Sequence, residues 1–130
     1  MDEYTMQQLG LPGVVLMENA GAKVTEEVLA FKPRKAVVLA GGGNNGGDGF
    51  VVARRLNDAG VPSELWLLAD PSRVKGDAKV HLDAYLRRGL PMYPVWELGI
   101  GPLRERLQQA DVIVDAMLGT GVRGAVREPF

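Results

Sequence analysis

The chain has 130 residues, enough for one domain with a buried core, and its 46% hydrophobic content is typical of a globular protein. Its 15 basic and 16 acidic side chains leave a net charge of −1 without a long block of one sign, which argues against a nucleic-acid or membrane-surface binder. There is no cysteine, so disulfides and thiolate chemistry are excluded. No apolar stretch is long enough to span a membrane, and the acidic start, Met1-Asp2-Glu3, is unlike a signal peptide, so we expect a soluble, cytoplasmic protein.

A helix is predicted over Val14–Phe31, because apolar residues recur there at helical spacing. The stripe consists of Met17, Ala20, Gly21, Val24 and Val28. Glu18 and Asn19 are the early polar residues of this helix. The simplest interpretation puts Glu18 near the positive end of the helix dipole and Asn19 at the surface.

The most informative stretch is a strand, a glycine-rich loop and a second helix. Ala36–Ala40 is a short apolar run typical of a strand buried on both faces of a parallel sheet. The loop Gly41–Gly49 reads GGGNNGGDG. Asp48 is expected to cap the helix that follows, which Gly60 ends. Free amide groups at such a helix start, together with the helix dipole, favour a bound phosphate.

The spacing of Gly41, Gly43 and Gly46 also matches the dinucleotide fingerprint GxGxxG. That pattern is weak alone, but a preceding strand and a following helix strengthen it. The simpler alternative is a tight turn that needs glycine only for its geometry. Asn44 and Asn45 add amide groups that an ordinary dehydrogenase loop lacks, and Asp48 places a carboxylate where a pyrophosphate prefers positive potential.

The middle of the chain predicts further alternation of strands and helices. Glu64–Ala69 is a second strand, ending at Asp70-Pro71. Asp70 either binds an adenosine ribose, as in a standard NAD site, or opens a loop, and we favour the loop because Asp-Pro is a common turn opening. Met92–Val95 is expected to be an edge strand, since Pro94 cannot donate to a sheet ladder.

A third helix is predicted between these strands and is expected to end at Gly89. Its buried stripe is predicted to be Ala78, Leu82, Tyr85 and Leu86. His81, the only histidine, lies on this helix. It is interpreted as a surface residue rather than a general base, because titrating chemistry needs a placed partner.

A second ligand-binding edge is predicted where the strand Val112–Val114 runs into Asp115 and a glycine turn at Gly119–Gly124. Ligands of open α/β sheets bind at the carboxyl ends of the strands, so both glycine turns are expected to face one crevice. Asp115 is either a loop cap or a buried oxygen ligand. With the amide oxygen of Asn45, its carboxylate would suit a hard cation.

Three motifs together resemble the N-terminal YjeF domain, the NAD(P)H-hydrate epimerase family. They are LMENAG at Leu16–Gly21, GGGNNGGDGFVVARRL at Gly41–Leu56 and DAMLGTGVRG at Asp115–Gly124. The resemblance implies a Rossmann-like, three-layer α/β/α fold with a mainly parallel sheet. It also implies that residues 1–130 form a single domain of this type, truncated at its C-terminus.

The resemblance implies a site as well. The residues expected to contact a hydrated nucleotide are Asn44, Asn45, Gly46, Gly47 and Asp48 from the first loop, and Gly119, Thr120, Gly121, Val122, Arg123, Gly124 and Ala125 from the second. Potassium is expected on Asn45 and Asp115. Arg123 either adds charge against phosphate or is a solvated loop arginine.

The implied activity is epimerisation of the R form of NADHX or NADPHX, nicotinamide cofactors hydrated in the ring, to the S form that a partner dehydratase repairs. The resemblance implies that the dehydratase is either fused to the domain or a separate protein, and that the domain forms a homodimer. The family's acid/base aspartate and a further potassium-binding serine lie in a later VD-x-P-S-G motif. The 130 residues end at Phe130 before it, so the catalytic residue is unknown and these residues alone are expected to be inactive.

Two other functions stay open. One is a non-catalytic nucleotide-binding or scaffold module, because the domain also resembles modules of an apolipoprotein A-I binding protein and of mRNA-decapping scaffolds. The other is an NAD-dependent dehydrogenase module, which would use Asp70 on the ribose and would not respond to potassium.

Overall fold

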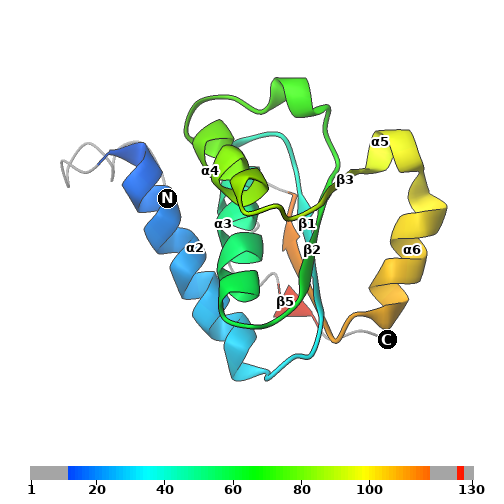
Figure 1. Cartoon of the computed structure of the whole chain (residues 1–130). Coiled ribbons are helices and arrows are strands. Elements are labelled where there is room, and N and C mark those ends of the chain that lie inside the picture. The colour runs from blue at the N-terminus through cyan, green and yellow to red at the C-terminus, as the bar shows by residue number, and fades with distance from the viewer. Residues whose placement is uncertain (1–11, 118–125, 128–130) are drawn as a thin grey trace.

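The computed structural model describes residues 12–117 and 126–127, which form three layers, with a sheet between two layers of helices (Figure 1). The elements in chain order are α2 (Gly13–Ala30), β1 (Ala36–Ala40), α3 (Asn44–Asp58), β2 (Ser63–Leu67), the 3-10 helix η1 (Pro71–Arg73), α4 (Gly76–Arg87), β3 (Met92–Pro94), α5 (Val95–Leu98), α6 (Ile100–Gln109), β4 (Val112–Ala116) and β5 (Val126–Arg127). The predicted α/β/α class is confirmed. None of the helices in this part of the chain combines the length and apolar character needed to cross a membrane.

The described strands lie in the order β3-β2-β1-β4-β5. The first four run parallel, and β5 is antiparallel to β4. The sheet is therefore mainly parallel, as predicted. β3 lies at the edge of the sheet. Pro94 has no N–H to donate, and at an edge this does not interrupt the hydrogen bonding inside the sheet.

The two faces of the sheet are covered by different helices. Helices α2, α3 and α4 pack on one face, and α5 and α6 pack on the other (Figure 1). Every residue of β1 is buried: Val38 faces the first layer, while Val37 and Leu39 face the second. A strand covered on both faces needs apolar side chains throughout, which is why β1 shows no polar alternation.

The connections change faces between β1 and β4. Helix α3 joins β1 to β2 and α4 joins β2 to β3 on one face, whereas α5 and α6 lead from β3 to β4 on the other. β1 and β4 are nevertheless neighbours, with Leu39 opposite Asp115 and Ala40 opposite Ala116. Strand order reverses at this point, and open α/β sheets bind ligands at the carboxyl ends of the strands there.

The buried face of α4 differs from the prediction. His81 is 4% exposed, whereas Leu86 is 40% exposed, so the surface interpretation of His81 and the burial of Leu86 were both wrong. The start of α2 covers this part of α4, and His81 Nε2 lies 2.9 Å from the carbonyl oxygen of Val14. Periodicity identifies an apolar stripe, but it does not show which face a third helix covers.

Candidate functional site

The turn after β1 lies directly against the end of β4. The Gly41 N–H donates to the carbonyl oxygen of Ala116 at 3.2 Å. A Cβ on Gly41 would come within 2.8 Å of the Met117 carbonyl oxygen. Side chains larger than hydrogen do not fit there, so the backbones of the two strand ends lie in direct contact.

The first turn of α3 is packed equally closely. Gly46 N–H donates to the Gly43 carbonyl oxygen at 3.0 Å, and a Cβ on Gly46 would lie 1.9 Å from the Gly41 carbonyl oxygen. This close approach of helix to strand is the role of the third glycine in a dinucleotide fingerprint. The helix thus starts beside the strand end, and the backbone amides of its first turn lie at that edge of the sheet, an arrangement that favours an anionic ligand.

Two further glycines hold α3 between α2 and β4. A Cβ on Gly47 would lie 2.3 Å from Met17 Sδ of α2. A Cβ on Gly49 would lie 3.0 Å from Ala116 Cβ of β4. The glycine pattern therefore serves packing on both sides of the helix as well as the turn itself.

Asp48 does not cap α3. The helix begins at Asn44, with Gly43 as its N-cap, so Asp48 is already inside the helix. The close packing of Gly46 and Gly47 explains why a glycine-rich stretch of low helix propensity becomes helical. Asp48 is 7% exposed, and its burial raises its pKa from 3.8 to about 6.

Asp115 lies at the end of β4, opposite Leu39 of β1. Its side chain is partly buried, and its Oδ1 accepts a hydrogen bond from the Met117 N–H at 3.1 Å. This bond gives Asp115 the local capping role that was one of the two interpretations. The carboxylate lies at the same sheet edge as the glycine turn, so an oxygen-ligand role is compatible with its position.

Several predicted site residues fall outside the description. The side chains of Asn44 and Asn45 and the whole of Gly119–Ala125 lie outside the described residues. The backbone of Asn44 and Asn45 forms the start of α3, next to the end of β1. Within the described residues, no group of three or more His, Cys, Asp or Glu side chains is arranged to hold a metal ion.

Asp70 follows β2 and opens the 3-10 helix η1. Its Oδ1 accepts hydrogen bonds from the Ser72 N–H and hydroxyl, each at 2.9 Å. The bond from the Ser72 N–H lowers the pKa of Asp70. The loop-opening interpretation is therefore confirmed.

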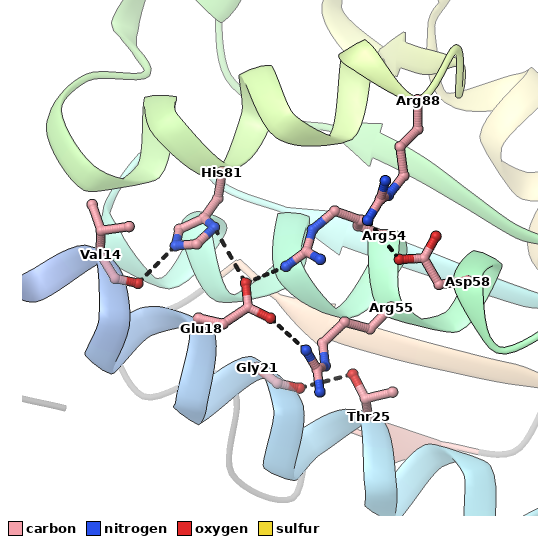
Figure 2. A network of polar contacts seen from close by, with 9 residues as sticks. All are labelled: Val14, Glu18, Gly21, Thr25, Arg54, Arg55, Asp58, His81 and Arg88. Atoms are coloured by element: carbon pink, nitrogen blue, oxygen red, sulfur yellow. Dashed lines mark hydrogen bonds and ion pairs between the residues drawn. The ribbon is translucent and has the colours of Figure 1, made fainter.

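Sequence reasoning missed the partners of Glu18. Glu18 lies in the second turn of α2, past the region where the helix dipole acts, and it faces α3 and α4 (Figure 2). Its Oε1 accepts a hydrogen bond from Arg54, and its Oε2 accepts one from Arg55 at 2.6 Å. The two adjacent arginines after the apolar run of α3 were a visible signal, but their direction depends on how the helices pack.

Comparison with known proteins places this geometry in a family. Residues 13–130 match the family described as "YjeF-related protein N-terminus". An NAD(P)H-hydrate epimerase of Pirellula staleyi is 42% identical, over 98% of this chain and 57% of that protein. A bifunctional NAD(P)H-hydrate repair enzyme Nnr of Archaeoglobus fulgidus is 45% identical, over 95% of this chain and 24% of that protein.

A solved structure has a similar fold. The crystal structure of the yeast protein ynu0 (YNL200c) superposes with a TM-score of 0.74 at 30% identity, covering 95% of this chain and 54% of that one. The chain thus spans only part of each of these relatives. The matched residues include α2, the glycine turn, α3 and β4, which form the edge of the sheet described above. The chain belongs to the YjeF-related N-terminal domain family.

Proposed function

We propose that the protein containing this domain is an NAD(P)H-hydrate epimerase, which converts the R form of NADHX or NADPHX to the S form. The observation that carries the proposal is the glycine turn packed on the end of β4 at the reversal of strand order, with Asp115 beside it. The names of the Pirellula and Archaeoglobus relatives support the same chemistry.

The chemistry of the substrate fits a site whose main role is to bind and orient the substrate. The carbon to be inverted bears both a ring nitrogen and a hydroxyl group. The hydroxyl must leave and return on the opposite face, assisted by the nitrogen lone pair and by an acid/base group. In this proposal the amides at the start of α3 bind the pyrophosphate, and Asp48 accepts hydrogen bonds from nucleotide hydroxyls.

Potassium is part of the proposal. Asp115 and Asn45 would hold the ion, because carboxylate and amide oxygens are the ligands that hard cations prefer. The register supports this assignment, since Asp115 ends one strand and Asn45 follows the neighbouring strand by a short turn. When bound, the ion supplies positive charge beside the anionic dinucleotide. The second loop, Gly119–Ala125, is proposed to contact the nucleotide.

The proposed functional partner is a dehydratase that consumes the S form. Relatives named as bifunctional repair enzymes support this partnership, whether the dehydratase is fused or separate. A homodimer and a cytoplasmic location stay predictions.

The decisive experiment is a chiral assay of R-NADHX and R-NADPHX with the complete protein, with and without potassium. The proposal expects the S form to appear much faster than it does spontaneously. Unchanged isomer together with tight nucleotide binding would instead favour the non-catalytic binding module. Redox turnover of NAD that is independent of potassium would favour the dehydrogenase module.

A further inference from the structure

Glu18 joins three helices on one face of the sheet. It lies on α2, Arg54 and Arg55 lie on α3, and His81 lies on α4 (Figure 2). His81 Nδ1 is 3.7 Å from Glu18 Oε1, while its Nε2 faces the Val14 carbonyl oxygen back on α2. The carboxylate therefore pairs α2 with α3 through two arginines, and it lies close to His81 of α4.

Arg54 depends on this carboxylate. Its side chain is 12% exposed, that of Glu18 is 29% exposed, and Arg54 Nε is buried without a hydrogen-bond partner. Within the described residues, Glu18 is the only acidic partner of Arg54. Breaking a largely buried ion pair by removing one partner leaves an uncompensated charge, so Glu18 and Arg54 are strongly coupled.

The same segment of α2 touches the start of α3. Met17 Sδ occupies the space beside Gly47, one residue before Glu18 in the sequence. A Cβ on Gly21 would lie 2.4 Å from Val51 Cγ1 and 3.3 Å from the Asp48 carbonyl oxygen. Helix α2 cannot turn or slide without pressing on the first turns of α3 or leaving a gap there, because packed interiors have no slack.

We propose that Glu18 is a positioning residue: by pairing α2 with Arg54 and Arg55 of α3, it fixes the first turns of α3 at the edge of the sheet where β1 and β4 end. The inference rests on the proposed function for its kinetic consequence, but its structural consequence is independent of the reaction. Loss of Glu18 lets α2 shift, and the start of α3 then loses its support at Gly47.

The test compares Glu18→Ala and Glu18→Gln with Asp58→Asn in the complete protein. Asp58 is a matched control, because it also pairs with an arginine next to α3, Arg88 at 2.8 Å, but both side chains are 44% exposed. Hydrogen exchange is measured at the amides of Gly49 and Phe50, whose helical acceptors are the carbonyls of the first turn of α3.

Glu18→Ala is expected to raise exchange at these two amides about tenfold more than at β1, and to raise KM about tenfold with kcat within about twofold. Glu18→Gln should recover part of both effects, since its amide oxygen still accepts from Arg54. Asp58→Asn should change neither. If Glu18→Ala does not fold, the Gln variant carries the test through the same two measurements.

Equal increases in exchange across α2, α3 and β1, with KM unchanged, would overturn the inference, because they describe a loss of global stability alone. If the unmodified protein has no epimerase activity, the proposed function fails. The local exchange at Gly49 and Phe50 then still decides the positioning role.

Discussion

Gly46 of α3 lies so close to Gly41 at the end of β1 that a Cβ on Gly46 would be 1.9 Å from the Gly41 carbonyl oxygen. No side-chain adjustment relieves this contact, because the obstructing atom belongs to the backbone. The helix and the strand must separate if a methyl group is added. The close packing of α3 on the end of β1 therefore requires glycine at position 46.

Gly46→Ala is expected to destabilise the fold by about 3 kcal/mol or more, as overpacking against a fixed backbone does. Gly101→Ala is the matched control, since this helical glycine has open space around it. That control should change stability by no more than about 1 kcal/mol, because the better helix propensity of alanine is opposed by the ring of Pro102, which crowds a helical residue before it. Urea unfolding of both variants measures the difference. Equal stability of the two would show that α3 does not rest on β1.

Asp48→Asn is expected to stabilise the protein at pH 7. The pKa of Asp48 is raised from 3.8 to about 6, so the native state resists ionisation of this buried carboxyl. Its favourable contribution is fully present below about pH 4 and is lost as pH rises through about 6. The variant should gain up to about 2 kcal/mol at pH 7 and almost nothing at pH 4.

Chemical unfolding at pH 4, 5, 6 and 7 checks this prediction. Asp58→Asn serves as the control, because it makes the same substitution at a side chain that is 44% exposed. A gain for Asp48→Asn that is the same at every pH would contradict the linkage argument.

Asp115→Asn is expected to abolish the potassium dependence of nucleotide binding while leaving the fold intact. The substitution keeps an oxygen that can accept the Met117 N–H, but it removes the charge that would attract a cation. Calorimetric titration with ADP-ribose in potassium and in a large organic cation measures the effect. Asp111→Asn is the control, because Asp111 precedes β4 at the opposite end of that strand. Undiminished potassium dependence in Asp115→Asn would remove Asp115 from the ion site.

His81→Leu is expected to destabilise the protein by about 1–2 kcal/mol, despite replacing a polar group in a buried position by an apolar one. The substitution removes the contact of His81 Nε2 with the Val14 carbonyl oxygen, which ties α4 to the start of α2. Thermal and urea unfolding test this. A stabilised variant would show that the buried imidazole contributes nothing through its polar contact.

Much of the fold follows from local patterns. Ala36–Ala40 is the predicted strand to the residue, because an uninterrupted apolar run bounded by lysine and glycine leaves little choice. Gly60 and Gly89 end helices with φ of 89° and 76°, where glycine was expected. The shared edge of β1 and β4 was predictable too, since parallel strands in an open sheet bring their carboxyl ends together.

What could not be predicted depends on packing between helices. The predicted start of α3 and the predicted capping role of Asp48 were wrong. Close contacts with Gly41 and Met17 outweigh the poor helix propensity of Asn and Gly, so the helix begins earlier, at Asn44. The burial of His81 was missed for a similar reason: the covering surface comes from α2, distant in sequence. The contacts of Glu18 with Arg54, Arg55 and His81 could not be predicted either, because they depend on the relative positions of three helices.

A sheet edge at which backbone packs directly on backbone reverses the usual pattern of mutational sensitivity. In most binding sites, truncating a side chain is the damaging change. Between Gly41 and Gly49 the harmful substitutions are enlargements, because Gly41 and Gly46 have main-chain atoms where a methyl group would lie. A saturation survey of this loop should therefore find almost no tolerated residue at these two positions, while Gly43, with open space around it, accepts small ones.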